Sequence, residues 1–470
     1  MKFNQISALL AACALAGGCM MGPNYRKPLV DLPEETASAD YSVFTTVKWW
    51  EAFNDPILNQ MEEEALQYNK DLRLAMARVD EARANVGVAV ADQLPGLSVA
   101  GETGRAGNAR GSGQTQSTAG AVVSFELDLW GKYRRLSEAA RAQLLASEAN
   151  RDNVRLALTA NVARGYFSLR ALDEQLNIAT RTLQTRQESV RVYQSRYENG
   201  YCTEVDLRRI EASMASVQAQ QQELKLSIEK AEKALTVLLG RSPRAMVQDG
   251  VERGQSLAAM TLVPDVPEGL PSDLLARRPD VRQAEGQLMA ANANIGAARA
   301  AYFPSIPLTA SAGYASAALN QLFTGGQQGV WALTAKVTGP IFAGGKIRSQ
   351  NKAVKAKYVQ MLATYEKTVQ GAFKEALDAI AANKINRDVF DSYQQQTRAM
   401  RRSYDLTKKQ EEAGLIDVTD LLNVESTLLS AEMSESSARL SELNSVVTLC
   451  QALGGGWNQN DGFSAQEKTK

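Results

Sequence analysis

Alternating apolar and polar residues mark four short segments of the chain. Residues 123–129 read VSFELDL, so every second side chain is apolar. Residues 306–314 and 331–338 alternate in the same way, and residues 97–105 alternate more weakly. A period of two predicts β-strands, and strands of about ten residues have the length that a tilted strand needs to cross a bilayer. Two segments rich in Gly, Ser, Gln and Asn are predicted as the connecting loops: residues 104–117 and 315–329.

Two long stretches without proline predict unusually long helices. They run from Leu136 to about Asn199 and from Ile347 to about Ala413. At a rise of 1.5 Å per residue, each helix would approach ~100 Å. The helices that follow them are predicted at 203–239 and 417–453.

The two shorter helices differ in their apolar pattern. From residue 207 to residue 238, apolar residues recur at alternating spacings of three and four, interrupted only by Gln221. This pattern is typical of a coiled-coil seam. In residues 417–453 the apolar residues form two stripes, so we expect neighbours on two sides of that helix.

A glycine separates the long helix from the shorter one in each pair. Gly200 and Gly414 suit the position just after a helix end, where a left-handed backbone is common. Thr203-x-x-Asp206 and Asp417-x-x-Asp420 then resemble capping boxes that start the next helix. The sequence therefore predicts two helical hairpins.

Self-comparison indicates an internal repeat. Ala84-Asn85-Val86-Gly87 matches Ala293-Asn294-Ile295-Gly296 at an offset of 209, and Asp206-Leu207 matches Asp420-Leu421 at an offset of 214. The offset is constant before and after a single insertion in the second half of the chain. This predicts two copies of one unit, at 63–240 and 272–454. Each copy reads helix, two strands and helical hairpin. The remaining predicted parts are an N-terminal segment 19–62, a link 241–271 and a tail 455–470.

The first 18 residues resemble a lipoprotein signal peptide. Lys2 precedes an apolar stretch, and Ala16-Gly17-Gly18 ends at Cys19, which resembles a lipobox. Cys13 is a weaker alternative for the lipid-bearing cysteine, and an unlipidated secreted protein is the other interpretation. Covalent lipid on Cys19 is the only prosthetic group that we expect. We expect Cys202 and Cys450 to be unpaired, because the helix map places them about 50 Å apart.

Charge and composition narrow the function. Basic and acidic residues number 52 each, so charge gives no argument for nucleic acid as a partner. The chain has no histidine, which excludes a Ser-His-Asp triad and His-ligated zinc, and it carries no Walker A motif. No stretch approaches 18 consecutive apolar residues, so we predict no transmembrane helix. An enzyme could still use carboxylates or lysine, but the commonest catalytic residue sets are absent, and we expect no enzyme.

A membrane-spanning part would then have to consist of β-strands. Four strands cannot close a barrel, for which about eight is the practical minimum. A barrel therefore requires several copies of the chain, each donating four strands. A small two-sided sheet in a soluble domain is the alternative.

Several motifs in order resemble the TolC-like outer-membrane efflux proteins, specifically the lipoprotein branch that serves RND drug pumps. The resemblance covers nearly the whole mature chain and rests on these segments: the lipobox at Cys19, Gly22-Pro23-Asn24-Tyr25-Arg26-Lys27-Pro28, Trp49-Trp50, Leu127-Asp128-Leu129-Trp130-Gly131, Arg277-Arg278-Pro279-Asp280-Val281, Phe303-Pro304 and Pro340-Ile341-Phe342-Ala343-Gly344-Gly345.

The resemblance implies an α+β membrane protein in the bacterial outer membrane. Three copies would form a 12-stranded β-barrel continued by a long periplasmic α-helical barrel, with a belt built from the N-terminal segment, the link and the tail. The implied function is the exit duct of a tripartite efflux pump for drugs or other small toxic compounds. Its partners would be a periplasmic membrane-fusion adaptor, an inner-membrane RND transporter and outer-membrane lipid.

The resemblance also implies a gate at the periplasmic hairpin turns. Asp420 matches a position where an acidic ring closes the tunnel, and Ile416 matches an apolar ring. Three carboxylates near a threefold axis would repel one another and attract cations. Asp206, the repeat partner of Asp420, is counted among the gate residues, although we favour a structural role for it. The turns at Gly200 and Gly414 would dock the adaptor.

Two features found in parts of the family are missing here. Some members carry a second acidic residue three positions after the first, where this chain has Asn423. Others close the gate with Tyr and Arg at positions where this chain has Glu411 and Ile416. We therefore expect that this latch is absent and that opening is controlled differently.

Other functions remain open at this point. Related ducts serve heavy-metal efflux and type I protein secretion. A periplasmic lipoprotein adaptor or scaffold is a different class, which would have one hairpin and a lipoyl-like β-domain. A carboxylate-based enzyme is the third class, but no paired acids lie in a pocket-like context.

Overall fold

The computed structural model describes residues 20–29, 47–107, 113–248, 250–260, 277–322, 325 and 328–455. The predicted signal peptide 1–18, Cys19, most of the tail 455–470 and parts of the segments 19–62 and 241–271 lie outside these residues. The chain divides into two compact units. The first comprises 1–31, 77–149 and 282–368, and the second comprises 32–76, 150–281 and 369–470.

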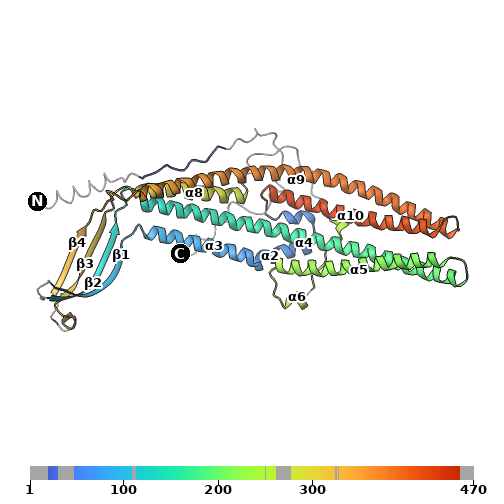
Figure 1. Ribbon diagram of the computed structural model, residues 1–470, viewed down its shortest axis with the longest axis horizontal. Helices are drawn as coiled ribbons and strands as arrows, with labels where there is room; N and C mark the ends of the chain where they lie inside the picture. The colour runs from blue at the N-terminus through green and yellow to red at the C-terminus, as the bar shows by residue number, and fades with distance from the viewer. Residues whose placement is uncertain are drawn as a thin grey trace. The chain divides into compact units, whose positions relative to one another are not determined.

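The first unit contains one antiparallel sheet of four strands in the order β1-β2-β3-β4 (Figure 1). The strands are β1 (Gly96–Gly107), β2 (Gly113–Glu126), β3 (Pro307–Ser316) and β4 (Gln328–Ala335). β2 pairs with β3 across the two halves of the chain, with Val122 opposite Ser311. The sheet thus confirms four strands and leaves β1 and β4 as its edges.

The strand ends differ from the prediction. β1 and β2 continue through most of the expected loop 104–117, and β2 ends at Glu126 rather than at residue 129. Backbone pairing extends the hairpin where the side chains are small or polar, because ladder hydrogen bonds do not require an apolar alternation. Side-chain periodicity therefore underestimated this hairpin.

The two edge strands are exposed on both faces. Every residue of β4 is exposed, including Trp331 at 82% and Leu333 at 75%. In β1, Val99 is 87% exposed. The register places Val99 and Trp331 on the same face of the sheet, and large apolar side chains exposed on strands with an open edge are unusual in a monomeric soluble sheet.

The helices occur as two series of matching length. α3 (Lys70–Ala91) and α8 (Pro279–Ala300) have 22 residues each, and α4 (Lys132–Glu198) and α9 (Lys346–Glu412) have 67 each. α5 (Glu204–Leu238) and α10 (Val418–Ala452) have 35 each. The predicted hairpins α4–α5 and α9–α10 are therefore confirmed, with ends within four residues of those expected (Figure 1).

The predicted coiled-coil seam of α5 is confirmed by burial. Leu207, Ile210, Val217 and Leu235 are buried, and none of the other seam positions is fully exposed. Gln221 is buried as well, and its amide donates a 2.9 Å hydrogen bond to the hydroxyl of Thr180 on α4. The one polar residue of the seam is thus satisfied by the facing helix.

The main core of the second unit surrounds two short elements, the 3₁₀ helix η2 (Trp49–Phe53) and α2 (Pro56–Tyr68). Phe53 packs edge-on against Phe167 of α4 at 4.9 Å between ring centroids. Asp55 caps α2 through Ile57 N, and it also accepts hydrogen bonds from the Tyr166 hydroxyl (2.6 Å) and Gln255 N (3.1 Å). This carboxylate therefore joins α2, α4 and the segment 250–260.

The other short elements are α6 (Ala245–Gln248), η3 (Leu257–Ala259) and η4 (Leu319–Leu322). Within the part of the chain that the structure describes, no helix is both long and apolar enough to cross a membrane. Cys202 and Cys450 are free, as expected, and Cys450 is buried.

Candidate gate at the helical hairpin turns

Both hairpin turns have the predicted glycine geometry. Gly200 and Gly414 have φ values of 75° and 69°. Tyr201 N bonds to Arg196 O at 2.8 Å, and Leu415 N bonds to Gln410 O at 2.9 Å. These bonds satisfy carbonyl groups at the helix ends, as in a Schellman motif. The left-handed glycines therefore turn each chain directly from the long helix into the shorter one.

The first predicted capping box forms. The Thr203 hydroxyl lies 3.3 Å from Asp206 N and accepts its hydrogen bond, and the Asp206 carboxylate accepts from Thr203 N at 3.1 Å. The Thr203 hydroxyl also lies 2.6 Å from that carboxylate. Hydrogen bonding by the Thr203 side chain lowers the pKa of Asp206. The hydrogen bonds of the Asp206 carboxylate are thus used to cap the N-terminus of α5.

The second predicted capping box is wrong. Asp417 occupies the N-cap of α10 but makes no capping hydrogen bond through its side chain. Instead its carboxylate accepts a 3.2 Å hydrogen bond from the Thr419 hydroxyl. A Thr at the N-cap can donate to an Asp three residues later, whereas two carboxylates at these positions repel each other. Asp420 is exposed, and the described residues offer its carboxylate no side-chain partner.

Ile416 and Asp420 lie on either side of Val418, which is buried. Ile416 is half-buried, whereas Val418 packs into a small cluster with Tyr193, Leu207 and Ile210 from the other hairpin. The turn of α9–α10 is therefore held through Val418. The two residues expected in the gate stay closer to the surface.

A contact that the sequence did not predict joins the two hairpins just before their turns. The Glu411 carboxylate of α9 accepts hydrogen bonds from the Tyr193 hydroxyl at 2.6 Å and from the Arg196 guanidinium at 2.7 Å. The Arg196 guanidinium also lies 4.7 Å from the centre of the Tyr193 ring. We call this group the Glu411 clamp. At the position of Glu411, some family members carry a residue that closes the gate, and the sequence indicated only that this residue is absent here.

A buried ion pair connects the hairpins further from the turns. Arg186 of α4 lies 2.9 Å from Glu425 of α10, and their side chains are only 1% and 8% exposed. The Ser213 hydroxyl of α5 also contacts the Arg186 guanidinium. Desolvation raises the pKa of Glu425, and the charge of Arg186 opposes that change.

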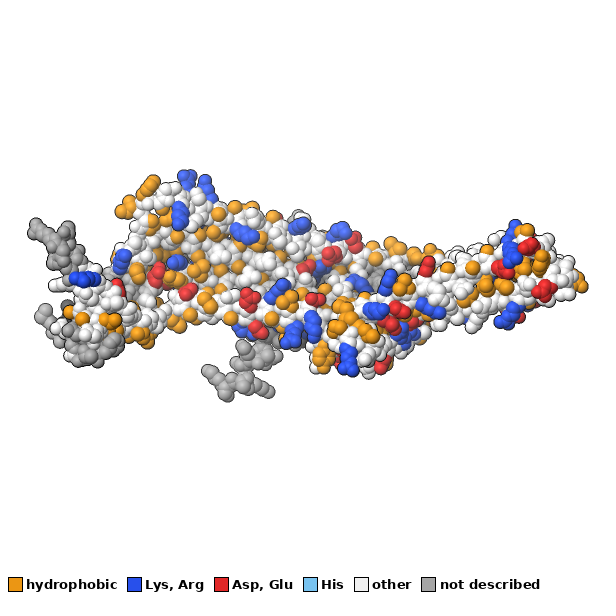
Figure 2. Space-filling model, turned by 60° about the horizontal axis from the view of Figure 1, so that its bottom comes forward, with side chains coloured by type: hydrophobic (Ala, Val, Ile, Leu, Met, Phe, Trp, Pro, Cys, Tyr) orange, Lys and Arg blue, Asp and Glu red, His pale blue; other side chains and the backbone are white. Residues whose placement is uncertain are grey.

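Further polar links lie near the turns. The Arg209 guanidinium of α5 donates to the Thr419 hydroxyl of α10 at 2.9 Å. Figure 2 shows acidic and basic side chains close together at the end where the turns lie, on the right of both views. Among the described residues, no group of three or more His, Cys, Asp or Glu could hold a metal ion. The hairpin tips are therefore tied together by hydrogen bonds and ion pairs.

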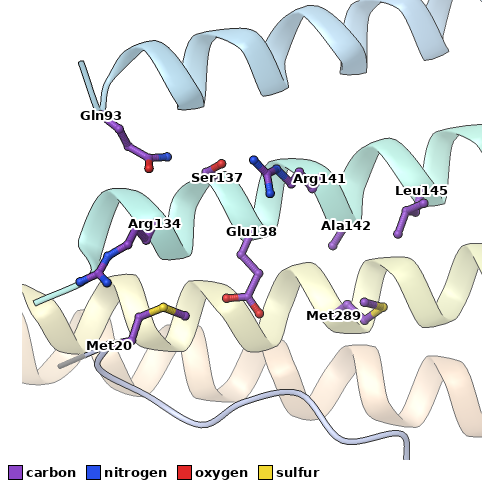
Figure 3. Close-up of a pocket in the computed structure, with 9 residues that line it drawn as sticks. All are labelled: Met20, Gln93, Arg134, Ser137, Glu138, Arg141, Ala142, Leu145 and Met289. Atoms are coloured by element: carbon purple, nitrogen blue, oxygen red, sulfur yellow. The ribbon is translucent and has the colours of Figure 1, made fainter. Parts of the chain in front are cut away.

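A second candidate site lies in the first unit, beside the residue that follows Cys19. Met20 borders a pocket of about 400 Å³ together with residues of α4 and one residue each from α8 and the segment after α3 (Figure 3). The neighbouring backbone is fixed by Arg135, which is buried and donates to Met21 O at 3.0 Å and to the Asn24 side chain at 2.9 Å. Tyr25 then contacts Glu285 of α8 at 3.2 Å. We call residues 20–27 the N-terminal strap.

Known proteins resemble the chain over almost its whole length. A family model described as "Outer membrane efflux protein" matches residues 62–241 and 270–455. The antibiotic efflux pump outer membrane protein ArpC of Pseudomonas putida is 33% identical, covering 98% of each chain. The cation efflux system protein CusC of Escherichia coli is 31% identical, covering 94% of this chain and 96% of its own.

Solved structures give the same result. The CmeC outer membrane channel of Campylobacter jejuni superposes with a TM-score of 0.87 at 27% identity, covering 94% of this chain and 96% of its own. These likenesses confirm an outer-membrane protein of efflux systems, and they exclude the adaptor and the enzyme as alternatives. The chain belongs to the outer membrane efflux protein family.

Proposed function

We propose that three copies of the chain form the exit duct of a tripartite efflux pump. The observation that carries this proposal is the open four-stranded sheet, in which the outer edges of β1 and β4 are unpaired and both strands are exposed on both faces. Pairing β1 of one copy with β4 of the next would remove every open edge. Three copies would supply twelve strands, which exceeds the minimum for a closed barrel.

The helices would continue this barrel into the periplasm. The equal lengths of α3 and α8, α4 and α9, and α5 and α10 support a duplicated unit, in which six matching units would surround one tunnel. A periplasmic membrane-fusion adaptor would dock at the turns around Gly200 and Gly414, and an inner-membrane RND transporter would supply substrate. The duct itself performs no chemistry.

The gate would be formed at the hairpin tips. Asp420 is exposed and lacks the capping role that occupies Asp206, so its charge is available to a ring of three carboxylates. Ile416 would add an apolar ring four residues earlier. Ile416 and Asp420 follow Glu411 by only a few residues along the chain. Movement of α9 against α4 would therefore move both rings.

Covalent lipid on Cys19 would anchor the chain to the membrane. Cys19 directly precedes the N-terminal strap, and Arg135 fixes the strap at the start of α4, close to the sheet. Intact-mass measurement of the mature protein tests this: we expect the mass of residues 19–470 plus acyl chains. A Cys19→Ala variant with an unchanged acyl mass would contradict it.

The substrates that we propose are drugs or other small toxic compounds, by analogy with ArpC. The likeness to CusC favours metal cations as a second candidate. Susceptibility profiling of a deletion strain distinguishes them. Loss of the duct should sensitise cells to antibiotics in the first case and to metal cations in the second.

The assembly is tested by electrophoresis without and with heating. We expect a heat-sensitive trimer in the outer-membrane fraction and ion conductance in planar bilayers. A monomer without conductance would overturn the proposed duct.

A further inference from the structure

An 80-residue part of the chain, residues 286–365, contains no Asp or Glu although the whole chain is electrically neutral. The same part carries seven basic residues: Arg299, Lys336, Lys346, Arg348, Lys352, Lys355 and Lys357. Five of these lie in the first turns of α9, immediately after the sheet. We call these five residues the basic start of α9.

The basic start of α9 has no acidic partner. All five side chains are exposed, and within the described residues none takes part in an ion pair or a side-chain hydrogen bond. Lys346 and Arg348, in the first turn of α9, also oppose the helix macrodipole. Neither pairing nor helix stability therefore explains their presence.

The start of α4, which occupies the equivalent place in the first half of the chain, is different. Lys132 lies 3.8 Å from Glu126, Arg134 lies 3.4 Å from Asp128, and Arg135 lies 2.7 Å from Glu138. The same position in the fold thus carries paired basic residues in one half and basic residues without acidic partners in the other.

The basic residues are arranged on particular faces of the helix. Arg348, Lys352 and Lys355 are separated by four and three residues, so they share one face of α9. Asn351, three residues after Arg348 and four before Lys355, lies next to this face and is buried, with its amide donating to Ala298 O at 2.8 Å. The basic face therefore borders the packing between α8 and α9, while its three side chains are exposed.

Exposed apolar side chains lie directly before this face. Ile341 and Phe342, in the turn between β4 and α9, are 103% and 91% exposed. Apolar side chains followed by a basic helix face are typical of segments that bind a membrane surface, where the apolar groups enter the bilayer boundary and the cations meet anionic headgroups.

We propose that Arg348, Lys352 and Lys355 bind the headgroups of anionic phospholipids, with Ile341 and Phe342 inserted at the edge of the bilayer. The inference rests on the proposed orientation, in which the sheet lies in the membrane and α9 leaves it. Charge complementarity selects anionic lipid over zwitterionic lipid. The site would fix the depth of the barrel in the membrane.

The test measures lipids retained by the full-length protein. Protein purified in mild detergent is incorporated into nanodiscs that contain phosphatidylethanolamine with one-fifth phosphatidylglycerol. Native mass spectrometry then counts the lipids that stay bound. We expect phosphatidylglycerol to be enriched on the wild-type protein and the enrichment to fall about tenfold in the variant R348Q/K352Q/K355Q, because each removed cation weakens attraction to an anionic surface.

Two variants serve as controls. R348K/K352R/K355R preserves charge and should retain the enrichment. K225Q/K230Q/K233Q removes the same charge from exposed positions of α5 and should also retain it. Equal enrichment in R348Q/K352Q/K355Q and the wild type would overturn the proposal.

An alternative occupant of the basic face is an acidic surface of a second copy. In that case R348Q/K352Q/K355Q would lower the temperature at which the trimer dissociates while leaving lipid retention unchanged, which would overturn the lipid proposal. Conductance in planar bilayers is measured on the same samples. Loss of lipid enrichment with normal conductance supports the lipid site, whereas absence of conductance in the wild type would refute the duct instead.

Discussion

The hydroxyl of Tyr193 donates a 2.6 Å hydrogen bond to the carboxylate of Glu411 and thereby joins the two helical hairpins close to their turns. Arg196, three residues further along α4, binds the same carboxylate at 2.7 Å. Only 10% of the Glu411 side chain is exposed, so its carboxylate is largely shielded from water, whereas 37% of the Arg196 side chain is exposed. The carboxylate therefore opposes separation of α4 and α9 at the place where a gate would open.

Glu411→Ala should loosen the hairpin tips. Each hydrogen bond to a charged group contributes about 1.5–3 kcal/mol to stability, and this substitution removes two such bonds. We expect faster amide hydrogen exchange at the end of α9 and more frequent channel opening in planar bilayers. Glu412→Ala is the matched control, because Glu412 is exposed and adjacent. Equal exchange rates in the two variants would show that the clamp does not hold the tips.

The ion pair between Arg186 and Glu425 should stabilise the same hairpins by a different route. Removing one partner of a buried pair leaves an uncompensated charge, so Arg186→Ala should cost about 3–5 kcal/mol in the free energy of unfolding. The double variant Arg186→Met/Glu425→Leu should recover most of this loss, because no charge remains buried. Arg191→Ala changes a residue of the same helix whose side chain is 75% exposed, and it should have little effect. Thermal denaturation in detergent measures all three.

The sequence predicted the hairpins because their determinants are local. Proline-free stretches, the seam of α5 and the glycines at 200 and 414 each act within a few residues. The Glu411 clamp depends instead on how far α9 is shifted along α4. Tyr193 and Glu411 are 218 positions apart, and no local pattern fixes that shift.

The incorrect prediction at Asp417 shows that residue spacing alone does not determine whether a capping box forms. The spacing of Asp417 and Asp420 fits a capping box, but two carboxylates at these positions repel each other, whereas the uncharged Thr203 hydroxyl accepts from Asp206 N without such repulsion. Strand ends were missed because backbone pairing, unlike burial, leaves no side-chain period. The lipid-attachment prediction at Cys19 lies outside the described residues and stays a prediction.

Arg135 should control the N-terminal strap. Its buried guanidinium binds Met21 O and Asn24, so Arg135→Ala removes the contacts that fix the strap beside α4. We expect amide exchange in residues 21–27 to accelerate at least tenfold, which corresponds to about 1.4 kcal/mol. Arg141→Ala is the control, because Arg141 is exposed on the same helix and borders the same pocket. Acceleration of the same size in the control would assign the effect to general loosening of α4.

Glu62 should make stability depend on pH. Its side chain is fully buried in α2, and neither carboxylate oxygen has a hydrogen-bond partner in the described structure. Burial raises the pKa of Glu62 well above its usual value. The folded chain therefore binds this proton more tightly than the unfolded chain does. The resulting stabilisation is complete below the unfolded pKa and is lost as the pH rises through the folded pKa.

Glu62→Gln removes this titration while keeping the shape of the side chain. We expect the variant to melt at a higher temperature than the wild type at pH 8, with the difference shrinking toward pH 4. One kcal/mol corresponds to roughly 2–4 °C for a domain of this size. Glu63→Gln, at an exposed neighbouring position, should leave the pH profile unchanged. Parallel profiles for Glu62→Gln and the wild type would show that the Glu62 carboxyl does not titrate differently in the folded chain.

Asp420 and Asp206 are repeat partners with different surroundings, and this difference separates a gate from a helix cap. Asp420→Asn removes a charge but keeps the size of the side chain, so a ring of three carboxylates would lose its mutual repulsion and its attraction for cations. Single-channel conductance should change, and cation selectivity should fall. Asp420→Ala also removes side-chain volume and should raise conductance. Unchanged conductance in Asp420→Ala would remove Asp420 from the gate.

Asp206→Asn is the matched test of the cap. The Asp206 carboxylate binds the backbone and hydroxyl of Thr203, and Asn keeps an acceptor but removes the charge at the start of α5, so stability should fall by about 0.3–1 kcal/mol. Conductance should stay near that of the wild type, because the carboxylate is occupied at the start of α5. If Asp206→Asn alters selectivity as strongly as Asp420→Asn, both repeats contribute charge to the tunnel. The asymmetry between Thr203 and Asp417 would then have no consequence for gating.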